Sequence, residues 1–137
     1  MTKSVLLLPL LLTSLPTSNA NYKNLPCETP ALASSCFRIH GRLNQGNGTP
    51  STRLWQIGTH HVYGIYSNQY GFIHDDATLD NESPKLPTNV EKQRTSDGNG
   101  YLGYVYADFE VCPLERHIEG HMQAACIQSA THVVAEH

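Results

Sequence analysis

The sequence predicts an all-β protein, a small antiparallel β-sandwich of about seven strands that is stapled by disulfide bonds. Three observations support this fold class. Several short stretches alternate apolar and polar residues with a period of two, which is typical of strands with one buried face. No stretch of about ten residues carries the apolar stripe of a surface helix. Four cysteines follow an export signal, which favours a disulfide framework.

The first 20 residues have the features of a cleavable signal peptide. Lys3 precedes the apolar run 5–12, Pro16 follows it, and residues 18–20 (Ser-Asn-Ala) offer small side chains to a signal peptidase. We expect cleavage after Ala20 and a secreted or periplasmic mature protein. A retained membrane anchor is the alternative, but the apolar run is shorter than the roughly 20 residues that cross a bilayer. The sequence therefore predicts no membrane insertion after cleavage.

The charge balance limits the classes of partner. The chain carries 9 Lys and Arg residues against 12 Asp and Glu residues, a formal net charge of −3 at pH 7. Loss of Lys3 with the signal peptide makes the mature chain more acidic. No basic stripe could neutralise a run of phosphates, so nucleic acid and anionic membrane surfaces are poor candidates as partners, and we expect no nucleic acid to bind. The expected partner is a protein or a small molecule of unknown identity.

The cysteines Cys27, Cys36, Cys112 and Cys126 are an even number in a small exported chain, so we expect them to form disulfide bonds. Three pairings are possible. We favour Cys27 with Cys36 and Cys112 with Cys126, because each bond closes a short loop and could join adjacent strands. A zinc or redox site is the alternative use, but no Cys-x-x-Cys spacing occurs.

The mature chain divides into an irregular arm, residues 21–34, and a single domain, residues 35–137. The arm is rich in proline and small residues. The domain begins with an alternating strand over residues 37–43, and Gly46-Asn47-Gly48 then supplies residues that tolerate the positive φ of a tight turn. Further strands are expected over residues 53–58 and 61–66.

The second half of the domain starts with a polar segment, residues 75–97, that predicts a long surface loop with a short strand near Val90. A turn at residues 97–100 leads into a strand over residues 101–112. One face of that strand is apolar and is expected to be buried: Val105, Ala107, Phe109 and Val111. A last pair of strands is expected over residues 122–129 and 131–136.

A family resemblance covers residues 36–74. The matching features are residues 37–43 (Phe-Arg-Ile-His-Gly-Arg-Leu), Gly46, residues 48–50 (Gly-Thr-Pro), Leu54-Trp55 and residues 67–72 (Ser-Asn-Gln-Tyr-Gly-Phe). This order resembles the opening of prealbumin-like β-sandwich domains, the group of transthyretin-like and carboxypeptidase regulatory-like domains. The resemblance implies a β-sandwich.

Two enzyme families of that group can be compared with the chain. Transthyretin-related hydroxyisourate hydrolases end in Tyr-Arg-Gly-Ser, whereas this chain ends in Val-Val-Ala-Glu-His, which argues against that activity. Residues 54–56 (Leu-Trp-Gln) are similar to a strand of intradiol dioxygenases, whose non-haem iron is held by two tyrosines and two histidines. Tyr63 and Tyr66 follow that strand here, but the later His-x-His strand is missing. The comparison therefore favours a chain that is not an enzyme.

The chain is rich in histidine, with eight histidines among its 137 residues. Neutral imidazole is a common ligand of copper and zinc, so a histidine-rich site outside the cytoplasm is a second hypothesis. The candidate ligands fall in three local groups: His60 and His61, His74, and His117 and His121. The His-Glu-x-x-His order of zinc proteases does not occur, and solvated surface histidines are the alternative interpretation.

Taken together, these features predict an exported, non-catalytic β-sandwich module that binds an unknown ligand or partner and needs no cofactor. The alternative function is extracytoplasmic binding of copper or zinc. No Gly-x-Ser-x-Gly elbow or other catalytic motif is present. Trp55 and the tyrosines could line a face that binds sugars or peptides, although packing within the core is the other use of such side chains.

Overall fold

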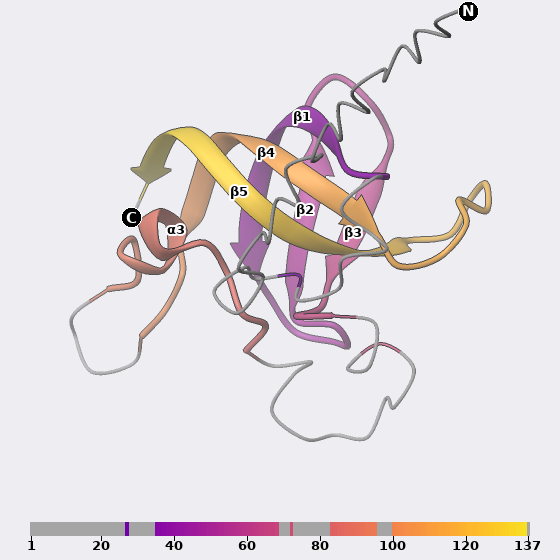
Figure 1. Ribbon diagram of the computed structural model, residues 1–137. Coiled ribbons are helices and arrows are strands. Elements are labelled where there is room, and N and C mark those ends of the chain that lie inside the picture. The colour runs from indigo at the N-terminus through magenta and orange to yellow at the C-terminus, as the bar shows by residue number, and fades with distance from the viewer. Residues whose placement is uncertain (1–26, 28–34, 69–71, 73–82, 96–99, 137) are drawn as a thin grey trace, which may run out of the picture.

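The computed structural model describes residues 27, 35–68, 72, 83–95 and 100–136 (Figure 1). The expected signal peptide, and all of the expected arm except Cys27, lie outside these residues. The described chain contains five strands and one short helix: β1 (Phe37–Gln45), β2 (Thr52–Gln56), β3 (Val62–Ile65), α3 (Thr88–Glu91), β4 (Tyr104–Pro113) and β5 (Gln123–Glu136). Within the described ranges, no helix has the length and apolar character needed to cross a membrane.

The five strands close a barrel in the order β1-β2-β3-β5-β4. Neighbouring strands are antiparallel, apart from β3 and β5, which are parallel. The all-β class is confirmed, but the predicted sandwich of about seven strands is wrong. A period of two marks one buried face per strand, and that face can line a barrel as well as a sandwich. The barrel is closed by pairing of β1 with β4, which are far apart in sequence.

Two elements differ from the predicted ones. The end of the chain is one 14-residue strand, β5, where the pattern predicts two shorter strands. β5 does not end between the two predicted strands. Its pairing with β4 shifts register at two points, where the strand bends. At one of these points His132 has a left-handed φ of 53°. The strand expected near Val90 is helix α3, which uses Val90 to fill the barrel.

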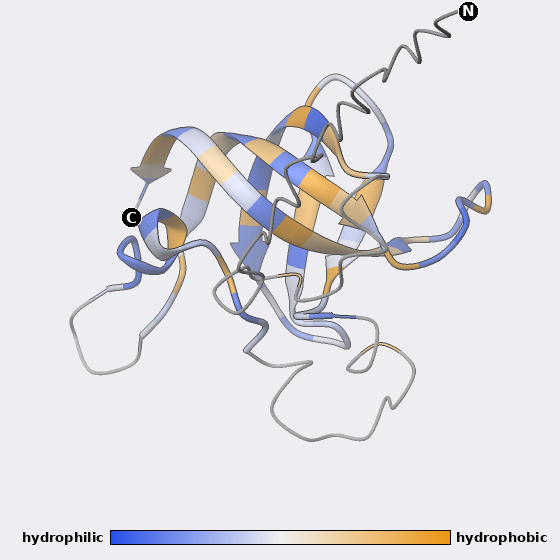
Figure 2. Cartoon of the chain, in the orientation of Figure 1, coloured by the Kyte–Doolittle hydropathy of each residue, from blue (hydrophilic) through white to orange (hydrophobic). Residues whose placement is uncertain are grey.

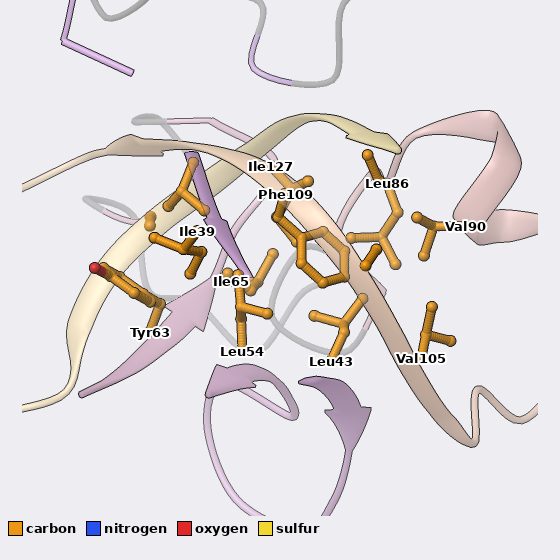
Figure 3. Packing of buried hydrophobic residues seen from close by; sticks show 14 of the residues in the cluster. Ile39, Leu43, Leu54, Tyr63, Ile65, Leu86, Val90, Val105, Phe109 and Ile127 are labelled. Carbon is orange, nitrogen blue, oxygen red and sulfur yellow. The ribbon is translucent and has the colours of Figure 1, made fainter. Parts of the chain in front are cut away.

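Apolar side chains fill the barrel (Figure 3). The alternation that predicts them is visible along β4 and β5 when the ribbon is coloured by hydropathy (Figure 2). Phe109 lies near the middle of the cluster, between Tyr63 at one end and Val90 at the other. The predicted inward face of β4 is confirmed, since four of its residues are fully buried: Val105, Ala107, Phe109 and Val111. Because the interior is packed, a ligand site has to lie on the outside.

Two positions of the fold require glycine, Gly41 and Gly48. A Cβ atom at Gly41, in the middle of β1, would lie 2.7 Å from Cδ1 of Leu54 and 3.1 Å from the carbonyl oxygen of Trp55. Only glycine therefore permits this close approach of β1 to β2. Gly48 has a φ of 103° in the turn between β1 and β2, which confirms the positive φ expected there.

All four cysteines form disulfide bonds, as predicted, but the favoured pairing is wrong. The bonds join Cys27 to Cys126 and Cys36 to Cys112, over sequence separations of 99 and 76 residues. No cysteine is left free. The two bonds are compatible with an oxidising compartment such as the predicted secreted or periplasmic location.

The strand register explains the pairing. Cys112 lies opposite Cys126 in the β4–β5 ladder, so the expectation that these two meet across adjacent strands is geometrically sound. Cys36 immediately precedes β1, whose ladder pairs Phe37 with Val111, and it therefore faces Cys112 from the other side. Cys112 bonds to Cys36 on β1, and Cys126 bonds to Cys27. The proximity of β1 to β4 could not be read from the spacing of the cysteines.

The strand order and directions resemble the OB fold, a five-stranded Greek-key barrel. The chain shares with it the parallel β3–β5 pair, the closure of β1 against β4 and a helix between β3 and β4. A topology of this kind hosts many unrelated functions, so it positions a site without identifying the ligand.

Candidate functional site

Two hollows lie side by side on the outside of the barrel. The first, of about 350 Å³, lies between the β2–β3 turn and the β4–β5 loop. We call it the histidine cleft, and the residues that define it are His60, His61, His117, His121 and Met122. Four of the five histidines predicted as metal ligands therefore line one hollow. The fifth, His74, lies outside the described residues.

A column of aromatic rings leads from the barrel core into the histidine cleft. The imidazole of His61 stacks on Tyr63, with ring centroids 4.3 Å apart and an interplanar angle of 17°. The imidazole of His117, on the exposed β4–β5 loop, covers His61 with centroids 4.5 Å apart and a tilt of 36°. Tyr63 itself is buried and contacts Phe37 at 6.2 Å between centroids. His61 is thus held between a fixed ring and an exposed one.

The surroundings of His61 favour its neutral form. Burial lowers the pKa of His61, the positive charge that His117 can carry lowers it further, and a polar contact with Gln123 opposes this in part. The Nε2 atom of His61 is buried without a hydrogen-bond partner. Burial also raises the pKa of Tyr63, whose hydroxyl contacts Oε1 of Gln56 at 3.4 Å. The cleft therefore presents a His61 imidazole that favours its uncharged form and whose Nε2 atom makes no hydrogen bond to a described residue.

The histidines do not build a closed metal site by themselves. Within the part of the chain that the structure describes, no three His, Cys, Asp or Glu side chains form a group that could hold a metal ion. The four cysteines are engaged in disulfide bonds. Tyr63 and Tyr66, which the dioxygenase comparison singles out, are buried in two different apolar clusters.

We expect the His61 imidazole of the metal-free protein to titrate below its usual pKa of about 6.5. Between the folded and unfolded pKa values the unfolded chain binds more protons, so stability falls as the pH drops through this window. His117→Ala removes the neighbouring charge and uncovers the ring, which should raise the His61 pKa. A proton NMR titration of the ring resonances in EDTA measures both values. A wild-type His61 pKa at or above 6.5 would contradict the geometry of the stack.

The second hollow, of about 460 Å³, lies on the outer face of β1, β2 and β3. We call it the arginine face, and it is lined by Arg42, Asn44, Arg53, Trp55 and Val62. Strand register places these residues together, since Arg42 lies opposite Trp55, Asn44 opposite Arg53 and Trp55 opposite Val62. The period of two turns all of them outward while their neighbours fill the core.

The guanidinium of Arg42 contacts two aromatic rings. Its guanidinium carbon lies 5.1 Å from the ring centroid of Trp55 and 4.8 Å from that of Tyr104, a distance typical of cation–π contact. The indole of Trp55 is in turn fixed by a 2.8 Å hydrogen bond from Nε1 to the carbonyl oxygen of Thr59. Sequence reasoning missed Arg42 and named Tyr104 only as one of the tyrosines, because alternation predicts that both face outward but not that they stack.

Neither arginine of this face pairs with an acidic residue of the described chain. Among the described residues no ion pair involves Arg42 or Arg53, whereas Arg94 pairs with Glu91. Arg53 donates hydrogen bonds of 3.2 Å to the carbonyl oxygens of Pro50 and Asn47. The Nε atom of Arg42 is buried and has no hydrogen-bond acceptor. Two positive charges that no described carboxylate pairs with therefore stand beside an aromatic surface, on a chain whose net charge is negative.

On another part of the surface, side-chain hydrogen bonds connect the strands β1, β4 and β5. His40 of β1 and His132 of β5 each donate Nδ1–H to one carboxylate oxygen of Asp108 on β4, both at 2.9 Å. The hydrogen bond from His40, and then that from His132, lowers the pKa of Asp108. His40 lies opposite Asp108 in the ladder, whereas the bend at His132 brings its ring to the other oxygen. Neither pairing has a signal in the sequence, and the trio is exposed.

Comparison with protein-family models, with curated proteins and with solved structures found no match to the chain. The resemblance of residues 36–74 to prealbumin-like domains remains an expectation from the sequence. Function has to be argued from the chemistry of the arginine face and the histidine cleft.

Proposed function

We propose that the protein is an exported, non-catalytic binding domain whose arginine face holds an acidic saccharide. One observation carries the proposal. The guanidinium of Arg42 is stacked between Trp55 and Tyr104, and no carboxylate of the described chain neutralises it. A cation that is oriented in this way, and left unpaired, is suited to an anionic ligand.

The chemistry of the face matches a sugar acid in two respects. A guanidinium offers several N–H donors in a plane and binds a carboxylate or sulfate through charge-assisted hydrogen bonds. Trp55 and Tyr104 add apolar ring surface, against which the C–H face of a pyranose can pack. Tyr104 is 46% exposed, so its ring is accessible to a ligand. Asn44 supplies amide groups for sugar hydroxyls in the same hollow.

Two further considerations favour a saccharide over a nucleic acid. Nucleic-acid binding depends on many phosphate contacts, and this face offers two arginines on a chain of net charge −3. By analogy of fold, OB barrels bind oligosaccharides or oligonucleotides on strands two and three and the adjoining loops. The arginine face overlaps that location, since Arg53 and Trp55 lie on β2 and Val62 lies on β3.

Trp55 is the sole tryptophan of the chain and lies in the proposed site, so its fluorescence reports binding directly. Titration with a short galacturonic acid oligomer should change the emission to saturation. We expect Arg42→Ala to weaken binding by about tenfold or more, as loss of a charge-assisted hydrogen bond predicts. The matched control is Arg38→Ala, because Arg38 is an exposed arginine of the same strand outside the hollow. It should bind like the wild type.

Three results would count against the proposal. Equal weakening by Arg38→Ala would show that only net charge matters. Equal binding of a neutral maltose oligomer would remove the role of the carboxylates. Stronger binding of a thymidine oligonucleotide would reassign the face to single-stranded nucleic acid, since bases also stack on aromatic rings.

A further inference from the structure

We propose that the histidine cleft binds one copper(I) ion through His61 and His117, with Met122 as the third donor. This site is separate from the arginine face and does not depend on the saccharide proposal. The first argument is the Nε2 atom of His61, which is buried and has no hydrogen-bond partner among the residues that the structure describes. A polar atom in that state costs free energy, and a bound ion is one of the few ways to satisfy it.

The second argument is the position of His117. Its ring is the group that covers His61, with centroids 4.5 Å apart. His117 is exposed on the β4–β5 loop, so a side-chain rotation can turn a ring nitrogen toward Nε2 of His61 without disturbing the core.

The third argument concerns the choice of metal. Zinc in a structural site takes four ligands in a tetrahedron, and the described residues hold no group of three His, Cys, Asp or Glu side chains that could supply them. Copper(I) accepts fewer ligands, and thioether sulfur is a soft donor that selects it. Met122 lines the same cleft and is 37% exposed. Its methyl group packs 3.3 Å from the point where Gly64 would carry a Cβ, so it lies along β3.

The fourth argument concerns Gln123, a neighbour of His61 that is itself fixed by hydrogen bonds. Gln123, the first residue of β5, donates its amide Nε2–H to the carbonyl oxygen of Glu115 at 2.9 Å. The Glu115 carboxylate accepts a 2.7 Å hydrogen bond from the backbone N–H of Ala124, which fixes the loop to the strand. The polar contact of Gln123 with His61 therefore comes from a side chain whose amide Nε2 is already fixed. Metal-binding histidines commonly have a hydrogen-bond acceptor on their other nitrogen, which sets the orientation of the ring.

The test is an anaerobic titration of the mature, disulfide-bonded protein with copper(I), in competition with the colorimetric chelator bicinchoninate. Ascorbate serves as the reductant, because it keeps copper as copper(I) and leaves the disulfides intact. We expect one copper per chain. His117→Ala should weaken binding by at least about tenfold, and Met122→Leu should weaken it less. His61→Gln should act like His117→Ala, with folding checked by the thermal melt.

His60→Ala is the matched control, because His60 is an exposed histidine of the same cleft that takes no part in the stack. It should retain wild-type affinity. Copper(I) is diamagnetic, so NMR provides a second readout in which the ring signals of His61 and His117 shift and that of His60 does not. Failure to retain copper against the chelator would overturn the proposal, as would equal weakening by His60→Ala. Saccharide binding by His117→Ala should be unchanged, which keeps the two proposals distinguishable.

Discussion

Replacement of Cys36 and Cys112 together by serine is expected to destabilise the protein by about 2–5 kcal/mol and can abolish folding at 37 °C. This disulfide joins the start of β1 to β4, the pair of strands that closes the barrel. Its loss frees a segment with a sequence separation of 76 residues in the unfolded chain. The remaining Cys27–Cys126 bond still ties the two ends of this segment together, so the effective loop is much shorter than the 76-residue separation. The chain-entropy model gives about 3 kcal/mol for a loop of roughly 15 residues, so the cost falls near the middle of the range.

Urea unfolding followed by Trp55 fluorescence measures the change, with the wild type before and after reduction as the reference. Replacement of Cys27 and Cys126 is expected to cost a similar amount, because the remaining Cys36–Cys112 bond shortens the effective loop in the same way. Peptide mapping of the unreduced protein by mass spectrometry checks the pairing directly. A peptide that links Cys112 to Cys126 would contradict the arrangement described above.

Phe109→Ala is expected to destabilise the barrel by about 3–5 kcal/mol. The ring of Phe109 is fully buried near the middle of the core, and its Cδ2 lies 3.4 Å from the position that a Cβ of Gly41 would take. Removal of the ring loses its transfer free energy and leaves a cavity that the closed strands cannot fill. The same urea titration provides the measurement.

Tyr101→Ala is the control for this substitution, because Tyr101 is an aromatic residue that is 53% exposed. Its cost should stay within about 0.5 kcal/mol, as is usual for surface sites. Phe109→Ala should still bind copper(I) and the galacturonic acid oligomer below its melting temperature, since both proposed sites lie outside the barrel. A loss of less than about 1 kcal/mol would show that Phe109 does not pack the interior.

The two hollows share a structural support, the turn between β2 and β3. Val62 lines both of them. Thr59 accepts the indole N–H of Trp55 on its carbonyl oxygen, and its hydroxyl accepts the backbone N–H of His61 at 3.0 Å. The same hydroxyl donates to the carbonyl oxygen of Gln56 at 2.8 Å. Trp55 on the arginine face and His61 in the histidine cleft are therefore anchored to one residue.

Part of the candidate site could be predicted from the sequence. The excess of histidine led to the residues that line the cleft, and Trp55 was identified as a residue that could contact a sugar. Arg42, the choice of Tyr104 among the tyrosines, and the trio of His40, Asp108 and His132 could not be found in this way. Each of these contacts joins residues on strands that are distant in the chain, and composition carries no information about which strands become neighbours.

The sequence by itself determined the local properties of the fold. Alternation with a period of two specified strands and the inward face of β4, and glycine specified the turn after β1. An even number of cysteines in a small chain specified disulfide bonds. Tertiary structure alone decided that the strands close a barrel, that Cys36 bonds to Cys112, and that the arginine face and the histidine cleft exist. The physical reason is the same throughout. Burial of an apolar face is a local requirement, whereas the choice of neighbouring strand depends on contacts between segments that are far apart in sequence.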